Sequence, residues 1–210
     1  MLDHQSIGER LHSIIRKDIL SGKYKPGQRL AFDQIAEENK VSMTPIKEAF
    51  LMLEQDNLVE IIPRRGTFVK KYSSKDIKEY YQIRLSLEFL AVDLICQNTL
   101  DKEYEEKLTQ TCDDLKTHYE DKDTNKCIYD DINFHKLLVE ASGNSQLYSI
   151  IQGLPITNLY SFTNKSEDYM KNSLSYLEEH LMIIDYLKQK QSKKAKEILS
   201  EHITLFYENN

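Results

Sequence analysis

Residues 41–69, which read VSMTPIKEAFLMLEQDNLVEIIPRRGTFV, decide the fold of this chain. At the start of this stretch Ser42 or Thr44 can cap a helix. Pro45 suits the first turn of such a helix because its missing N–H needs no partner there, and Glu48 is expected to reach back as a capping-box partner. The apolar face of this helix consists of Ile46, Ala49, Phe50 and Leu53. A capped amphipathic helix is therefore predicted here.

The same stretch ends in a predicted β-hairpin. Two β-rich runs, residues 58–62 and 67–69, flank the basic turn 63–66, which contains glycine. Upstream, apolar residues at helical spacing predict a helix over 7–20, and a short helix capped by Asp33 is expected to run through Asn39. Helix, short helix, turn, helix and hairpin follow one another in the order of a winged helix-turn-helix.

The rest of the chain predicts an all-helical domain. Helices are expected over residues 75–97, 101–121, 126–142, 144–163, 169–190 and 192–208. Short connections between long helices favour an antiparallel bundle. The predicted fold is thus mainly α, with a winged helix-turn-helix over residues 1–72 and an antiparallel helical bundle over residues 73–210.

Composition narrows the class of protein. Charged residues make up 30% of the chain and apolar residues 40%, as in ordinary globular proteins. No apolar run is long enough to span a bilayer, and the first twenty residues do not resemble a signal peptide. Cys96, Cys112 and Cys127 are an odd set without CxxC spacing, which favours reduced thiols. We expect a cytoplasmic protein without a membrane partner.

Charge is unevenly distributed along the chain. Residues 1–72 hold 12 Lys and Arg against 10 Asp and Glu, whereas residues 73–210 hold 16 against 24. The two parts therefore carry net charges of +2 and −8, which together give the total of −6. Phosphate binding depends on local potential, so DNA contact through the basic end is compatible with an acidic whole.

Candidate DNA-binding residues lie at the start of the predicted helix that begins near Ser42, which is the second helix of the helix-turn-helix, and at the wing. They are Ser42, Met43, Thr44, Lys47, Arg64, Arg65 and Gly66. The first residues of a recognition helix meet base edges in the major groove, and lysine can contact guanine or phosphate. Arginines at a wing tip can enter the minor groove, where glycine permits close approach. The alternative is that Lys47 and the two arginines are ordinary solvated surface residues.

Four residues of the helical domain have the spacing of a metal site. Asp131 and His135 are four residues apart on one predicted helix, so they share a face. His180 and His202 each lie 11 residues from the predicted turn at Gln191, so an antiparallel hairpin brings them level. Such a set fits Zn²⁺, Mn²⁺ or Ni²⁺. The alternative is four satisfied polar residues with a purely structural role.

Arg84 is a candidate for binding an anion. It lies on a predicted helix lined with apolar residues, and a buried guanidinium needs an anionic partner. One possibility is an internal pair with Glu88, and the other is the carboxylate of an organic-acid effector bound beside the metal. Tyr80, Asn133 and Asn158 are weaker candidates for the wall of the effector pocket.

The N-terminal residues resemble the GntR family of bacterial repressors. Residues 19–30 (ILSGKYKPGQRL) are similar to its opening, residues 41–50 to its recognition segment VSRTPVREAL, and residues 63–69 to its wing. The resemblance implies a homodimer that binds a palindromic DNA operator. Met43 and Lys47 stand where the family usually has arginine, which implies a different operator preference because lysine lacks the bidentate geometry of arginine.

The C-terminal residues resemble the FCD domain of the FadR subgroup. The resemblance rests on residues 131–138 (DINFHKLL), 141–144 (ASGN), 179–180 (EH) and 201–203 (EHI). In metal-binding members an aspartate and three histidines at these places hold the ion, which implies Asp131, His135, His180 and His202 here. Arg84 matches the arginine of a further family motif, R-x-x-(L/I)-E, which implies effector binding.

The competing class is a metal-dependent hydrolase, since an Asp/His₃ site with an open position can activate water. The sequence offers no clear general base, and a winged module has no role in such an enzyme. We therefore expect a transcriptional regulator rather than an enzyme, with an operator affinity controlled by a small organic acid.

Overall fold

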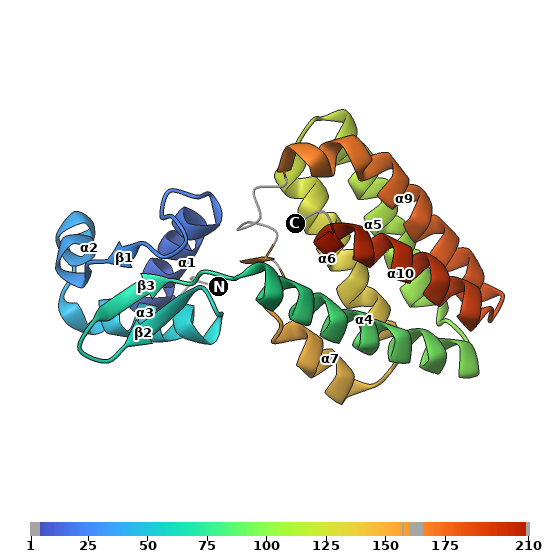
Figure 1. Cartoon of the computed structure of the whole chain (residues 1–210), viewed down its shortest axis with the longest axis horizontal. Helices are drawn as coiled ribbons and strands as arrows, with labels where there is room; N and C mark the ends of the chain where they lie inside the picture. Colours follow the sequence, from blue (N-terminus) through green and yellow to red (C-terminus); the bar gives the residue numbers. More distant parts are fainter. Residues whose placement is uncertain (1–4, 157, 160–165, 209–210) are drawn as a thin grey trace. The chain divides into compact units, whose positions relative to one another are not determined.

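The computed structural model describes residues 5–156, 158–159 and 166–208. The chain divides into two compact units between Tyr72 and Ser73. In chain order the elements are α1 (Ile7–Leu20), β1 (Arg29–Leu30), α2 (Phe32–Asn39), α3 (Met43–Gln55), β2 (Val59–Ile62), β3 (Gly66–Val69), α4 (Ser74–Gln97), α5 (Lys102–Glu120), α6 (Thr124–Ala141), α7 (Ser145–Gln152), α9 (Ser166–Lys188) and α10 (Ser192–Glu208) (Figure 1). The predicted mainly helical fold is confirmed. Within the described ranges no helix is both long enough and apolar enough to cross a membrane.

The N-terminal unit is a winged helix-turn-helix with three strands. Its antiparallel sheet has the order β1-β3-β2, and Ile62 pairs with Gly66 where the predicted hairpin turns. The strand β1, in which Arg29 pairs with Phe68, is missing from the sequence prediction. Two residues are too few to show the alternation by which a strand is recognised.

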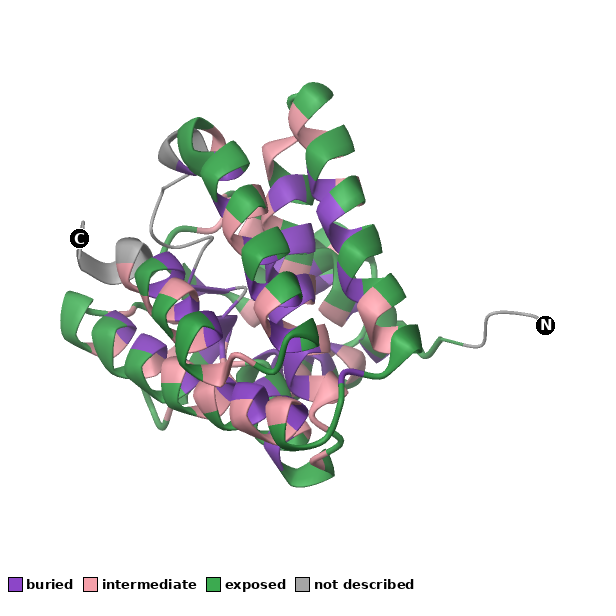
Figure 2. Ribbon diagram, turned by 90° about the vertical axis from the view of Figure 1, so that its right-hand side faces the viewer, coloured by how far each residue is buried: buried purple, intermediate pink, exposed green. Residues whose placement is uncertain are grey.

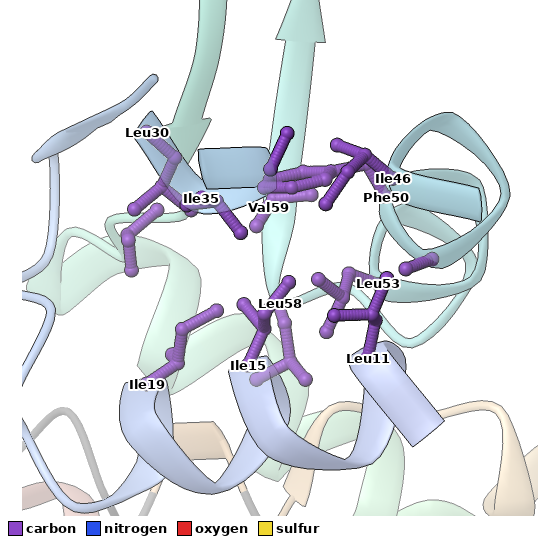
Figure 3. Packing of buried hydrophobic residues seen from close by; sticks show 13 residues of the cluster. Leu11, Ile15, Ile19, Leu30, Ile35, Ile46, Phe50, Leu53, Leu58 and Val59 are labelled. Atoms are coloured by element: carbon purple, nitrogen blue, oxygen red, sulfur yellow. The ribbon is translucent and has the colours of Figure 1, made fainter. Parts of the chain in front are cut away.

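One apolar core holds the winged unit together. Figure 3 shows α1, α3 and the sheet converging on it. Its buried members are Leu11, Ile15, Ile19, Leu30, Ile35, Ala36, Ile46, Ala49, Phe50, Leu53, Leu58, Val59 and Val69. Because α1 and α3 share this core, α3, the predicted recognition helix, is packed on a base that α1 and the sheet form.

The predicted cap of α2 is wrong, whereas the N-cap of α3 is one of the two predicted residues but lacks the expected capping box. Ala31 occupies the N-cap of α2, so Asp33 lies inside the first turn, where its charge still favours the helix dipole. Ser42 occupies the N-cap of α3 without a side-chain hydrogen bond. Glu48 lies a full turn beyond the N3 position that a capping box uses, and its side chain instead lies beside Gly8 of α1.

The second unit is a helical bundle in which α4 packs against α10 and α6, and α5 packs against α6 and α9. Helix α4 begins with a complete capping box between Ser73 and Asp76. Buried residues lie on the inward faces of the helices (Figure 2). On α9 most of them recur at every third or fourth position, at Tyr169, Ser173, Tyr176, His180, Ile183 and Leu187, and Ile184 widens the stripe. This spacing gives each helix one stripe that faces the core.

The single helix expected over residues 144–163 is wrong. Helix α7 ends at Gln152, with Gly153 as its C-cap. Pro155 follows two residues later and has no N–H to continue the ladder. The part of this prediction at residues 157 and 160–163 lies outside the described residues.

Candidate metal centre and DNA interface

Three helices bring the four candidate metal ligands together. Asp131 and His135 lie on α6, His180 on α9 and His202 on α10, and each stands in the buried stripe of its helix. All four are at most 1% exposed. Polar side chains in such positions are costly to bury unless they are paired or bind a ligand.

The donor atoms of this cluster lie within 4.8 Å of one another. The Nε2 atom of His135 is 3.0 Å from Nε2 of His202 and 3.4 Å from Nε2 of His180. Oδ1 of Asp131 lies 3.4 Å from Nε2 of His202 and 3.5 Å from Nε2 of His180. One carboxylate oxygen and three imidazole nitrogens therefore converge on a common point.

These separations fit the donor set of one transition-metal ion. Ligands that share a tetrahedral ion at about 2.0–2.1 Å lie about 3.3 Å from one another. Imidazole with carboxylate suits Zn²⁺ and its neighbours in the first transition row. The residues present thus match the chemistry of such an ion.

Glutamates occupy the outer nitrogens of two of these histidines. Nδ1 of His135 donates to Oε2 of Glu88 at 2.6 Å, and Nδ1 of His202 donates to Oε2 of Glu179 at 2.7 Å. Neither contact was predicted from the sequence. Glu88 is 47 residues from His135 in sequence, so no local spacing signals the pair.

Electrostatics in the cluster favour the metal-binding forms of Asp131, His135 and His180. Burial lowers the pKa of His135 and, still more, that of His180, so both rings are neutral at pH 7. Burial alone would raise the pKa of Asp131, but the hydrogen bond and charge of His202 outweigh it and the net pKa is lowered. Asp131 is therefore an anion beside two neutral imidazoles. For His202, burial lowers the pKa, but the hydrogen bonds and charges of Asp131 and Glu179 outweigh burial and the net pKa is raised.

The alternative internal partner of Arg84 is present in the structure. Its Nε donates to Oε1 of Glu88 at 2.7 Å, and both side chains are at most 1% exposed. Burial opposes ionisation of Glu88, yet its interactions with His135 and Arg84 outweigh burial and hold its pKa below the usual value. Arg84 is thus linked to the candidate metal ligand His135 through Glu88.

The other candidate effector residues differ in placement. Asn158 is buried, whereas Tyr80 and Asn133 are half-buried. Tyr80 lies one turn before Arg84 on the same side of α4. The ring of Tyr81 lies against the guanidinium, with its centroid 5.8 Å from Cζ of Arg84. Asn133 leaves α6 roughly 200° around the axis from Asp131, so it lies on a different face from the cluster.

A groove of about 810 Å³ runs across the winged unit between α3, the start of α2 and the wing. Among the predicted DNA-binding residues, Met43, Lys47, Arg64 and Gly66 line it, and Ser42, Thr44 and Arg65 lie exposed outside it. Its lining contains three cations, Arg29, Lys47 and Arg64, and one acid, Asp33. Its positive charge suits a phosphate backbone.

The wing tip needs unusual backbone conformations. Arg64 has φ of 62° and Gly66 has φ of 111°, a value that essentially only glycine adopts. A Cβ atom at residue 66 would also lie 3.0 Å from Nε of Arg29. Gly66 thus lets the Arg29 guanidinium lie against the wing.

Arg29 is a candidate contact that the sequence analysis did not single out. It is exposed on β1, lines the groove and lies beside the wing. Arg29 belongs to the KPGQRL segment that resembles the family, but only the pairing of β1 with β3 places this residue beside the wing. Met43 lines the groove and is half-buried, with part of its side chain packed against the apolar core.

Comparisons with known proteins agree with this architecture. Residues 7–69 match the family described as "Bacterial regulatory proteins, gntR family", and residues 79–205 match the FCD domain. The uncharacterized HTH-type transcriptional regulator YdhC of Bacillus subtilis (strain 168) is 30% identical over 92% of this chain and 86% of its own length. The HTH-type transcriptional repressor RspR of Escherichia coli (strain K12) is 25% identical over 95% of this chain and 86% of its own length.

A solved structure shares the whole fold. The GntR transcriptional regulator from Rhodococcus sp. RHA1 superposes with a TM-score of 0.80 at 23% identity, covering 98% of this chain and 97% of that chain. These relatives are transcriptional regulators rather than enzymes. With its winged N-terminal unit and its FCD domain, the chain belongs to the GntR family of bacterial transcriptional regulators.

Proposed function

We propose that this regulator is a repressor whose operator affinity is controlled by a small organic acid bound beside a divalent metal ion. The observation that carries the proposal is the convergence of three buried imidazoles and one carboxylate within 4.8 Å. Repression is supported by its relative RspR, which is named a transcriptional repressor.

Asp131, His135, His180 and His202 would hold the ion, with Zn²⁺, Mn²⁺ and Ni²⁺ as candidates. When bound, the ion would supply a positive charge for an effector carboxylate and would tie α6, α9 and α10 together. Arg84 would provide a second cationic group, because a guanidinium presents a planar fork of N–H donors that matches a carboxylate. Tyr80 and Asn158 remain candidates for the pocket wall.

On the DNA side, a homodimer would place two α3 helices in successive major grooves of a palindromic operator. Lys47, with Ser42, Met43 and Thr44, would face bases and phosphates, while Arg64, Arg65 and Gly66 would approach the backbone or the minor groove. Effector binding would change the placement of the two winged units in the dimer. Such coupling typically amounts to about 1–3 kcal/mol.

The test is a thermal-shift series on chelator-stripped protein. Each divalent metal is added alone, followed by a panel of organic acids with and without that metal. A ligand that binds the native state raises the melting temperature, so we expect a metal shift and a further acid shift that requires the metal. Arg84→Lys should keep the charge beside Glu88 but weaken the acid shift, because lysine lacks the guanidinium fork. No shift with any metal would reject the metal-dependent sensor.

The four residues could instead be purely structural. The hydrogen bond between His202 and Glu179 and the contacts of His202 and His180 with Asp131 favour that second candidate. It predicts a chain that binds DNA and shows no metal shift, so the same series separates the two.

A further inference from the structure

Two glutamates on different helices reach the metal cluster from outside. Glu88 lies on α4 and Glu179 on α9, and neither belongs to the four candidate ligands. We propose that both are positioning residues, which accept the Nδ1–H of His135 and His202 and so direct the two Nε2 lone pairs at the ion. The inference rests on the proposed metal site and adds to it the groups that prepare two of its ligands.

The location of the hydrogen atoms follows from the donors and acceptors. An ionised carboxylate has no hydrogen to donate, so the hydrogen in each contact, at 2.6 Å for His135 and 2.7 Å for His202, belongs to the ring nitrogen Nδ1. In the neutral form that can bind a metal ion, an imidazole carries only one N–H. The nitrogen Nε2 of each ring is therefore left with a lone pair.

These two lone pairs point at the same place. The Nε2 atoms of His135 and His202 are 3.0 Å apart, and Oδ1 of Asp131 lies 3.4 Å from the second of them. When both rings are neutral and carry their hydrogen on Nδ1, these three atoms present electron pairs to one another and repel unless a cation lies between them. The glutamates thus favour the Nδ1–H tautomer at both histidines, which leaves each Nε2 free to bind a metal ion. A hydrogen bond between the two rings would require a hydrogen on one of the Nε2 atoms.

The two glutamates are held in different ways. Glu88 is completely buried, and its second oxygen accepts from Nε of Arg84. The side chain of Glu179 is 18% exposed, and its second oxygen accepts from Oγ of Ser175 at 3.3 Å. Changing Glu88 would leave the buried Arg84 charge without its carboxylate, whereas changing Glu179 disturbs little besides His202.

His180 is oriented by packing. Its ring stacks on Phe134 with a centroid distance of 3.8 Å and an interplanar angle of 13°. The ring of His180 is therefore fixed without either glutamate, so loss of Glu179 should weaken the site and not abolish it.

Glu179 provides the decisive variants. Zinc affinity of the full chain is measured by competition with a chromophoric chelator for the wild type, Glu179→Leu and Glu179→Gln, with Glu178→Gln as control. We expect Glu179→Leu to weaken zinc binding by about 10- to 100-fold, the usual effect of losing such a partner. Glu179→Gln should lose less, because its amide oxygen still accepts the Nδ1–H. Substitution of the exposed neighbour Glu178 should leave the zinc affinity unchanged.

Ring-nitrogen NMR of the metal-free protein supplies a readout that a merely structural role would not move. We expect the Nδ1–H tautomer at His135 and His202 in the wild type, and a shift of His202 toward Nε2–H in Glu179→Leu. The tautomer of His135 in the wild-type spectrum tests the role of Glu88 without a substitution that could prevent folding. Zinc affinity of Glu179→Leu equal to the wild type, or Nε2–H tautomers in the wild type, would overturn the inference. Failure of the wild type to bind any metal would instead reject the proposed metal site, and the tautomers would still be measured.

Discussion

Gly8 of α1 lies directly against Glu48 of α3. A Cβ atom at residue 8 would lie 2.8 Å from Oε2 and 3.1 Å from Cβ of Glu48. The distal oxygen can move aside, but Cβ is fixed to the backbone of the recognition helix. The absence of a side chain at residue 8 therefore allows α1 to pack closely against α3.

Gly8→Val should destabilise the winged unit. A branched side chain at this contact must displace α1 from α3, and overpacking of this kind costs about 1–3 kcal/mol. Thermal unfolding followed by circular dichroism measures the change. Ser13→Ala on the exposed side of the same helix is the control and should alter the melting temperature much less. Equal effects of the two substitutions would refute this account of the contact.

Removal of the cations at the DNA-reading face should abolish operator binding. The triple variant Lys47→Ala, Arg64→Ala and Arg65→Ala loses a candidate base contact and both wing-tip charges. We expect no operator retardation in a gel and an unchanged zinc-to-protein ratio, since these residues belong to the other compact unit. DNA binding at the wild-type level would exclude this face as the reading head.

Arg29 should contribute a sequence-independent phosphate contact. Arg29→Ala is expected to weaken operator binding and to reduce the slope of log K against log salt concentration by about 0.9, the value for one phosphate contact. Fluorescence anisotropy over a salt series gives this slope. Arg10→Ala removes the same charge from an exposed position on α1 and serves as the control. A slope that remains at the wild-type value would remove Arg29 from the interface.

His180→Ala should lower metal content. This substitution removes one of four converging donor atoms, so that only those of Asp131, His135 and His202 remain. We expect a reduced zinc-to-protein ratio after gel filtration, measured by elemental analysis. The control is His118→Ala, which removes a histidine that hydrogen-bonds to Asp130 outside the cluster. Full zinc occupancy in His180→Ala would reject the proposed ligand set.

Asp130→Asn should flatten the pH dependence of stability. Burial raises the pKa of Asp130 despite its 2.6 Å hydrogen bond with His118. Between the unfolded pKa, about 3.9, and this higher value, the native state binds more protons than the unfolded state, so the free energy of unfolding falls as pH rises. Asparagine does not titrate and still accepts from His118.

The measurement is the melting temperature over a series from pH 4 to neutral pH. We expect Asp130→Asn to lose less stability than the wild type as pH rises through this interval. Asp113→Asn, on the exposed side of α5, should follow the wild type. Parallel curves for Asp130→Asn and the wild type would contradict the assignment.

Local signals in the sequence were sufficient for most of the elements. Helix α1 spans the predicted residues 7–20, and the capping box of Ser73 and Asp76 opens α4 near the expected place. Helical periodicity and caps depend on residues within one or two turns, so they can be read along the chain. The break after Gln152 was missed, although Gly153 and Pro155 are local signals for it.

For the candidate metal site, sequence by itself supplied the four residue types and their spacings, because Asp131 and His135 share a helix and a hairpin brings His180 level with His202. Only the tertiary structure showed that Glu88 reaches His135, and that Arg29 lies against Gly66. These contacts join segments dozens of residues apart, and their geometry depends on how whole helices and strands pack. Periodicity determines which face of an element is buried, whereas tertiary packing decides which side chain that face meets.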